Sequence, residues 1–343
     1  MKKPSVLIVG AGAMGMVNGY YLNLAGAQIS FLVRPGRRAV FSAPQTLYCY
    51  DDGELKTFDG YRVIEAIADA DAAALDYVLI TLDGASSRSA SGTAMLKEVG
   101  AAILPGSATL IMGGVGIGLR EHYLQSTGLP PSRVLNGILG VLCHQVSADL
   151  TAHTSTDSGK LAKAALAYRH FSHRTSLMLE STNPASARRF AALYNRNGLS
   201  RCIVINERLS SAMTNSVFPM LAASQIAGWP SVDGLVHNRE LWHLACRAQN
   251  EIAALPRHGW IGKLFSMLMT DRLSAMLHRK LEKDALPLSY QAFNRYHHGG
   301  KVHEQDVEIM RNCLIEGQHQ GLGMPALKEL LDRLAAFKAT HAA

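Results

Sequence analysis

The sequence lacks the cysteine patterns that build metal centres or disulfide frameworks. Five cysteines are scattered along 343 residues, and no two of them stand at C-x-x-C spacing. They are Cys49, Cys143, Cys202, Cys246 and Cys313. An odd number of scattered cysteines favours free thiols in a reducing cytoplasm. His144 and His153 have no second ligand pair at helical spacing, so we expect no metal site.

Long apolar runs and basic runs are absent as well. No apolar stretch approaches the roughly 20 residues that a membrane-spanning helix needs. The start of the chain leads directly into a candidate strand, so we expect no cleaved signal peptide. Lys and Arg exceed Asp and Glu by 34 to 27, but they form no run and do not alternate with aromatic residues. The basic balance therefore suits an anionic small molecule, and we expect no nucleic-acid partner.

A glycine motif follows the first apolar run of the chain. Residues 6–15 read VLIVGAGAMG, in which Gly10, Gly12 and Gly15 fit the pattern G-x-G-x-x-G. In a dinucleotide-binding βαβ unit these glycines make the tight turn, admit the pyrophosphate and let helix and strand pack closely. A helix N-terminus there would attract the phosphates. The predicted cofactor contacts are Gly10, Ala11, Gly12, Ala13, Met14 and Gly15. The alternative is a purely structural turn.

The residue after the second predicted strand decides between the two nicotinamide cofactors. The strand at 28–33 is followed by Arg34, with Arg37 and Arg38 close behind. Enzymes that use NAD usually place Asp or Glu there to bind the ribose 2′-hydroxyl. A guanidinium can instead bind a 2′-phosphate through two hydrogen bonds. We therefore predict NADP(H), the alternative for Arg34 being a solvated surface residue.

Strands and helices alternate over the first part of the chain. We expect strands at 5–10, 28–33, 78–82 and 109–112, and helices at 14–25 and 89–103. This alternation predicts an α/β fold with a doubly wound, Rossmann-type parallel sheet. Ligands bind beyond the carboxyl ends of such strands, so Leu82, Gly113 and Gly114 are further predicted cofactor contacts. The alternative for the glycines at 113–118 is a flexible crossover turn.

From residue 206 onward, long amphipathic stretches replace the strand signals. They cover 209–227, 239–257, 261–281, 306–320 and 325–339, and they predict an all-helical second domain. We expect a cofactor-binding domain at 1–205 and a helical domain for substrate binding and dimerisation at 206–343. The Ser-, Thr- and His-rich residues 145–205 either complete the first sheet or form an insertion over the cleft.

With these features the chain resembles the ketopantoate reductase family. The resemblance rests on the glycine motif, the arginine after the second strand, the glycines after strand 109–112 and the helical C-terminal half. GKVHEQD at 300–306 is similar to the family segment G-R-x-T-E-x-D, and GLGMP at 321–325 to its G-x-x-x-P. The resemblance implies NADPH-dependent reduction of a 2-oxo acid to a 2-hydroxy acid. It also implies that Glu304 binds and orients the substrate.

Several family positions differ in this chain. The family's catalytic lysine opens a helix with the pattern K-L-x-x-N-x-x-x-N, and its best counterpart, AMTNSVFPM, places Ala212 at the lysine. Asn215 remains, one position out of register. The asparagine of the family's N-G loop is Gly113, and its K-A-x-Q segment reads DGAS at 83–86. Ketone reduction needs a proton donor and a cation near the developing alkoxide. Another residue therefore replaces the lysine, or the substrate differs.

The segment 289–306 offers candidates for the missing proton donor. It reads SYQAFNRYHHGGKVHEQD, and we expect a substrate loop between helices with a flexible Gly-Gly hinge. His298 or Lys301 would donate the proton, and Glu304 would contact the substrate. The alternative is a solvated inter-helix loop whose histidines have no role.

We therefore expect an NADP(H)-dependent oxidoreductase that acts on the CH–OH group of a small, polar and anionic 2-hydroxy acid, or on the matching 2-oxo acid or a related carbonyl, bound between the domains. Two alternatives stay open, namely an opine- or imine-type C–N oxidoreductase and a catalytically silent NADPH-binding protein. A helical domain after a dinucleotide fold often dimerises, so we expect a homodimer. The resemblance points to pantothenate biosynthesis as the setting.

Overall fold

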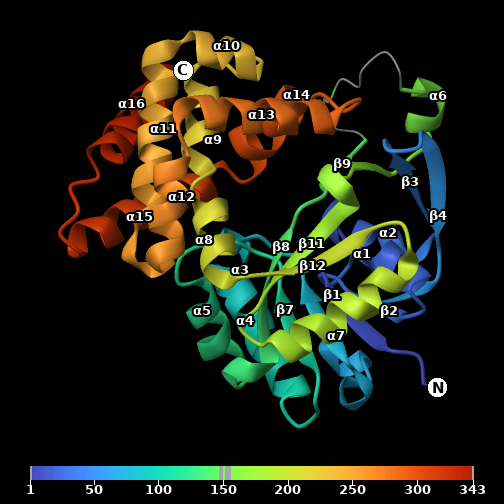
Figure 1. The fold of residues 1–343 in the computed structure, drawn as a ribbon. Helices are drawn as coiled ribbons and strands as arrows, with labels where there is room; N and C mark the ends of the chain where they lie inside the picture. The colour runs from blue at the N-terminus through green and yellow to red at the C-terminus, as the bar shows by residue number, and fades with distance from the viewer. Residues whose placement is uncertain (1, 147–149, 151–155, 342–343) are drawn as a thin grey trace. The chain divides into compact units, whose positions relative to one another are not determined.

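Residues 2–146, 150 and 156–341 are described in the structure, which is a computed structural model (Figure 1). His153, considered above as a metal ligand, lies outside these residues. The chain divides into two units, Met1–Ile205 and Asn206–Ala343. Strands occur in the first unit and helices make up the second, so the predicted α/β fold followed by a helical region is confirmed.

A mostly parallel sheet forms the centre of the N-terminal unit. Its strand order is β12-β11-β8-β7-β6-β1-β2-β5, and only the pair β8–β11 is antiparallel. The run β5-β2-β1-β6-β7-β8 is the order 3-2-1-4-5-6 of the Rossmann dinucleotide fold. The strands are β1 Ser5–Val9, β2 Gln28–Leu32, β5 Tyr61–Ile64, β6 Tyr77–Ile80, β7 Thr109–Met112, β8 Val134–Leu139, β11 Thr175–Glu180 and β12 Arg201–Ile205.

Helices cover both faces of this sheet, which explains why β1 is apolar throughout. Val6 and Ile8 join one core cluster with the apolar side of α1 and α7, whereas Leu7 and Val9 join another with α4 and α5. All four side chains are almost completely buried. These helices are α1 Ala13–Leu24, α4 Ala90–Ile103, α5 Leu119–Thr127 and α7 Pro184–Tyr194.

A second sheet, absent from the sequence prediction, packs on α1. Its order is β4-β3-β10-β9, with β3 Gln45–Cys49, β4 Glu54–Phe58, β9 Leu142–Gln145 and β10 Leu166–Arg169. Residues 145–205 therefore contribute to both sheets, because β10 belongs to the small sheet while β11 and β12 extend the large one. Short helices complete the unit: α2 Arg38–Ser42, α3 Gly84–Arg88, α6 Ser158–Leu161, η1 Ile67–Asp69, η2 Ala72–Ala74, η3 Pro131–Arg133, η4 Ser172–Arg174 and η5 Asn195–Asn197.

The C-terminal unit is built around α11, which packs against α9 and α16. Its helices are α8 Glu207–Asn215, α9 Phe218–Ile226, α10 Val232–His237, α11 Arg239–Ala253, η6 Pro256–His258, α12 Gly259–Leu268, α13 Asp271–Ala285, α14 Tyr290–Tyr296, the π-helix η7 His297–Lys301, α15 His303–His319 and α16 Pro325–His341.

Two of the predicted amphipathic stretches are each divided into two helices. The stretch 209–227 breaks after Asn215, where Pro219 stands in the first turn of α9 and lacks the N–H that a continuous helix needs. The stretch 261–281 breaks at Thr270, whose hydroxyl accepts a hydrogen bond from Leu273 N at 3.3 Å and caps α13.

Two features are absent from the residues that the structure describes. None of their helices is long and apolar enough to cross a membrane. Nor do three or more of their His, Cys, Asp and Glu side chains gather in an arrangement that could hold a metal ion.

Candidate functional site

The three glycines of the turn between β1 and α1 differ in why a larger side chain would or would not fit there. Gly10 has φ of +99°, a conformation that L side chains rarely adopt. A Cβ on Gly15 would stand 2.1 Å from Gly10 O, so α1 packs directly on the turn. A Cβ on Gly12 would meet no atom within 4 Å, and Gly12 is exposed. Gly10 and Gly15 are thus required by the fold, whereas Gly12 leaves open space outside it.

The open space at Gly12 lies at the N-terminus of α1. Gly12 is the N-cap residue, and neither a side-chain cap nor an acidic residue occupies the first turn. The uncapped backbone N–H groups and the positive end of the helix dipole suit a phosphate. Ala11 is buried, and Met14 Sδ lies 3.8 Å from Cys143 Sγ, so both side chains face the protein. The turn therefore fits the pyrophosphate of a dinucleotide.

Thr81 holds the turn in place and was not identified from the sequence. Its Oγ1 lies 2.9 Å from Val9 O and 3.2 Å from Gly10 O, to which it can donate a hydrogen bond. Leu82 follows it and lies 3.7 Å from the position of a Cβ on Gly10. The position of Thr81 directly after β6 was the available signal, since ligand sites lie beyond the carboxyl ends of parallel strands.

Gly113 and Gly114 occupy a crowded crossover. A Cβ on Gly113 would stand 2.6 Å from Leu139 Cδ1 and 2.7 Å from Ile80 O. One on Gly114 would stand 3.0 Å from Leu82 O. These glycines let the chain segments after β6 and β7 approach each other, so close packing explains the glycines at these two positions. Their predicted contact with the cofactor stays a prediction.

The segment DGAS at 83–86 forms a capped helical turn. Asp83 Oδ1 accepts a hydrogen bond from Ser86 N at 2.7 Å, and Oδ2 accepts one from Ser86 Oγ at 2.8 Å. Asp83 is thus the N-cap of α3. Its carboxylate is engaged within its own turn.

Arg34 lies two residues beyond the end of β2 and is exposed. Its neighbours have local contacts, because Arg37 lies over the Phe41 ring at 5.8 Å and Arg38 N donates to Glu65 Oε1 at 2.7 Å. Within the described ranges, no carboxylate pairs with the Arg34 guanidinium. Arg34 is therefore available to bind an anionic group near the glycine turn.

In the helical unit, the expected loop at 289–306 is helical. It comprises α14, the π-helix η7 and the first residues of α15, so both the flexible loop and the solvated loop are wrong. The Gly-Gly pair is also not a hinge, because a Cβ on Gly299 would stand 2.9 Å from Trp229 Cζ2. Packing against the indole ring, rather than flexibility, explains the glycine at 299.

Three of the four predicted catalytic residues lie on consecutive turns. His298 and Lys301 belong to η7, and Glu304 stands in the first turn of α15. Lys301 and Glu304 are exposed. Asn215 lies elsewhere, at the end of α8, where it is buried and donates from Nδ2 to Ser211 Oγ at 3.1 Å. Asn215 is thus turned toward its own helix.

A buried carboxylate orients His298. Its Nδ1 lies 2.7 Å from Asp306 Oδ2, which leaves Nε2 as the nitrogen for another partner. Burial raises the pKa of Asp306, although the hydrogen bond with His298 opposes this effect. The adjacent His297 stacks on Phe293, and burial lowers the pKa of His297 to about 3. His297 is therefore neutral at physiological pH and cannot replace the lysine as a cation.

Position 212 does not open a helix, contrary to the alignment made from the sequence. Helix α8 begins at Glu207, and Asn206 Oδ1 caps it by accepting from Arg208 N at 3.0 Å and from Leu209 N at 3.3 Å. Ala212 lies in the following turn and is completely buried. The alignment of Ala212 with the family lysine is therefore wrong.

Comparison with solved structures shows the same fold along almost the whole chain. A 2-dehydropantoate 2-reductase from Geobacter metallireducens GS-15 is 17% identical, with 97% of this chain and 99% of that chain covered and a TM-score of 0.63. A PanE/ApbA family ketopantoate reductase from Ralstonia eutropha JMP134 is 15% identical, with 99% and 100% covered and a TM-score of 0.64. D-mandelate dehydrogenase with NADH and anilino(oxo)acetate is 12% identical, with 99% and 100% covered and a TM-score of 0.63.

Comparison of sequences assigns the N-terminal part of the chain. No curated protein sequence matches it. Residues 6–160 match the family model of ketopantoate reductase PanE/ApbA, a match that begins within β1 and includes the glycine turn, β2, β6 and β7. The resemblance stated from the sequence is thus confirmed, since residues 6–160 of this chain are similar to the ketopantoate reductase PanE/ApbA family.

Proposed function

We propose that this protein is an NADP(H)-dependent oxidoreductase that interconverts a small 2-oxo acid and its 2-hydroxy acid. The supporting observation is the pairing of an open, uncapped helix N-terminus at Gly12 with an unpaired arginine after β2. The first suits a pyrophosphate and the second a 2′-phosphate. The match of residues 6–160 to a reductase family supports the reaction class.

The residues of the N-terminal unit would hold the cofactor. Backbone N–H groups at the start of α1 would bind the pyrophosphate, and Arg34 would bind the 2′-phosphate. The nicotinamide, when bound, supplies or accepts the hydride. Thr81 fixes the carbonyl of Gly10 and so keeps the turn in its binding conformation.

The helical unit would supply the polar chemistry. His298, held by Asp306 through Nδ1, would donate a proton from Nε2 to the substrate oxygen. Lys301 lies on the adjacent turn and would place a cation near the developing negative charge. Glu304 would bind the substrate hydroxyl, as the family resemblance implies.

The test is a measurement of NADPH oxidation by the full-length protein with ketopantoate and a panel of smaller 2-oxo acids, with NADH as the control cofactor. Turnover with NADPH exceeding that with NADH is expected. Arg34→Gln is expected to weaken NADPH binding by about tenfold or more, because a charged hydrogen-bonded pair is lost, and to leave NADH binding unchanged. Arg62→Gln, an exposed arginine on β5, is the matched control.

Three results would contradict the proposal. Equal use of NADH and NADPH, unaffected by Arg34→Gln, would exclude the 2′-phosphate contact. Turnover only with mixtures of an amine and a 2-oxo acid would indicate a C–N oxidoreductase. Tight NADPH binding without turnover of any substrate would indicate a binding protein.

A further inference from the structure

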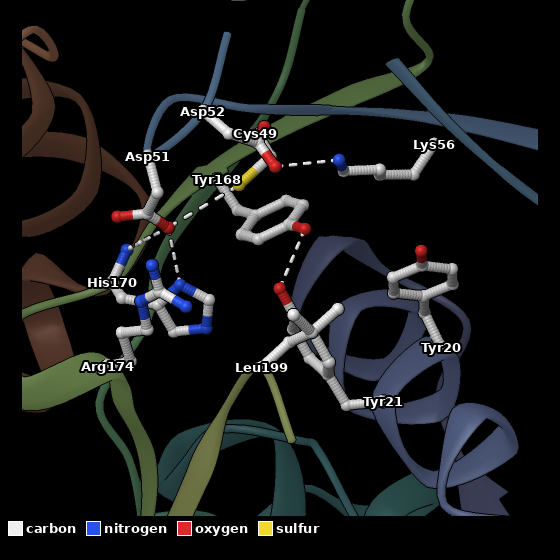
Figure 2. Close-up of a pocket in the computed structure, with 10 residues that line it drawn as sticks. All are labelled: Tyr20, Tyr21, Cys49, Asp51, Asp52, Lys56, Tyr168, His170, Arg174 and Leu199. Atoms are coloured by element: carbon white, nitrogen blue, oxygen red, sulfur yellow. Dashed lines mark hydrogen bonds and ion pairs between the residues drawn. The ribbon is translucent and has the colours of Figure 1, made fainter. Parts of the chain in front are cut away.

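The N-terminal unit contains a polar cavity away from the glycine turn. It lies between α1, the small sheet and the segments after β10 and before β12 (Figure 2). The lining residues are Tyr20, Tyr21, Cys49, Asp51, Asp52, Lys56, Tyr168, His170, Arg174 and Leu199. Tyr21 follows Gly12 by nine residues of helix, which corresponds to about 13 Å.

A buried histidine of the cavity has a ring nitrogen without a partner among the described residues. His170 is only 3% exposed, and its Nδ1 lies 2.5 Å from Asp51 Oδ2. Its Nε2 is shielded from solvent and has no partner in the part of the chain that the structure describes. A buried polar atom without a partner costs free energy, so the site is incomplete by itself.

The state of Asp51 determines what Nε2 can bind. Burial acts to raise the pKa of Asp51, but the hydrogen bond from His170 and the charge of Arg169 hold that pKa below its ordinary value. Asp51 is therefore ionised at neutral pH and accepts the Nδ1–H of His170. In the neutral imidazole this leaves Nε2 as a hydrogen-bond acceptor, which requires a donor such as a hydroxyl group.

The rim of the cavity provides an unpaired cation. Lys56 is paired with Asp52 at 2.7 Å, whereas none of the described carboxylates pairs with Arg174, which is exposed. A guanidinium binds a carboxylate through two parallel hydrogen bonds. The cavity thus offers a hydroxyl acceptor and a carboxylate partner.

Two tyrosine hydroxyls and a cysteine thiol of the cavity are suited to binding a ligand and not to attacking it as nucleophiles. The hydroxyls of Tyr21 and Tyr168 bond to each other at 2.8 Å. Burial raises the pKa of the Cys49 thiol to about 12, and its Sγ donates to Asp51 Oδ2 at 3.4 Å. Cys49 therefore stays protonated and unreactive.

From this arrangement we propose that the cavity binds a small hydroxycarboxylate. The carboxylate group lies on Arg174, and the hydroxyl group donates its hydrogen bond to His170 Nε2. The site uses none of the predicted cofactor contacts and does not depend on the proposed activity.

The experiment is a ligand-observed NMR titration of the full-length protein without cofactor, with lactate as the probe. Propionate lacks the hydroxyl group and propane-1,2-diol lacks the carboxylate, so each control removes one contact. We expect lactate to bind about tenfold more tightly than either. Arg174→Gln is expected to weaken lactate binding by about tenfold or more, whereas Arg62→Gln leaves it unchanged.

Three outcomes would overturn the proposal. The wild-type protein fails to bind lactate, or Arg174→Gln binds lactate as the wild type does, or propionate binds as tightly as lactate. Arg174 is exposed, so its variant folds. In a second variant, His170→Phe, the preference for lactate over propionate is expected to disappear, and its persistence would exclude the Nε2 contact. NADPH oxidation is measured separately, so either proposal can fail alone.

Discussion

Asp306 reaches back across the boundary between η7 and α15 to bind the ring of His298, with 2.7 Å between Oδ2 and Nδ1. Asp306 is buried, and its Oδ1 has no partner among the residues described. A carboxylate in this position fixes the orientation and tautomer of an imidazole, as in many general acid–base pairs.

If His298 is the proton donor of the proposed reaction, Asp306→Asn is expected to lower kcat/KM by about 10- to 100-fold. NADPH affinity is expected to stay unchanged, because the proposed cofactor contacts lie in the N-terminal unit. Steady-state kinetics of Asp306→Asn, His298→Gln and the double variant check this. The double variant is expected to be no worse than His298→Gln, and full additivity would contradict a shared role. Asp332→Asn, in an exposed ion pair with Lys328, is the control.

Alanine substitutions at two glycines of the turn are expected to have opposite effects on stability and on NADPH binding. Gly15→Ala places a methyl group 2.1 Å from Gly10 O and is expected to destabilise the fold by about 2 kcal/mol or more. Gly12→Ala meets no protein atom and has an allowed φ of −72°, so its melting temperature should stay near that of the wild type. The methyl group would instead occupy the phosphate space and weaken NADPH binding. Thermal melts and NADPH titrations separate the two effects, and unchanged NADPH affinity in Gly12→Ala would exclude the turn as the phosphate site.

Alanine substitutions in the Gly-Gly pair of η7 test whether this segment is packed or acts as a hinge. Gly299→Ala brings a Cβ to 2.9 Å from the Trp229 ring and is expected to destabilise the helical unit by about 1–3 kcal/mol. Gly300→Ala meets no atom within 4 Å, and alanine in a helix is expected to stabilise it by about 0.5–1 kcal/mol. Urea unfolding measures both. Equal effects of the two substitutions would indicate a flexible hinge.

A buried histidine makes the stability of the helical unit sensitive to acid. His258 is completely buried, and burial lowers its pKa from 6.5 to about 4. The unfolded chain binds this proton as pH falls below 6.5, whereas the folded chain does not. The contribution of neutral His258 to the free energy of unfolding is therefore fully present above pH 6.5. It decreases as the pH falls to about 4, by up to about 3 kcal/mol.

Unfolding free energies between pH 7 and pH 4.5 check the effect of His258. In His258→Gln the loss on acidification is expected to be smaller, while His319→Gln, at an exposed position, should behave as the wild type. A pH dependence of His258→Gln equal to that of the wild type would assign the effect to other groups.

The large sheet was predictable because its signals are local. The run VLIV forms a strand buried on both faces, and the glycines that follow it indicate the turn. The small sheet was not predictable in the same way. In its register Leu47 pairs with Leu166, more than a hundred residues later, and no local pattern in either strand specifies that partner.

The candidate site shows the same division. The glycine turn and Arg34 could be proposed from the sequence, since each directly follows a predicted strand. The hydrogen bonds of Thr81 depend on the position of β6 beside β1. The Gly-Gly pair was interpreted as a hinge because the sequence does not show that Trp229, seventy residues earlier, packs on Gly299.

Helix α1 lies between the two sheets of the N-terminal unit and contacts strands of both. Its first residues border the open space at Gly12, and its middle lines the cavity through Tyr20 and Tyr21. The two ligands proposed for this unit would therefore both contact the same helix, α1. If one ligand displaces this helix, the affinity for the other changes, and thermodynamic linkage then requires the two effects to be the same factor.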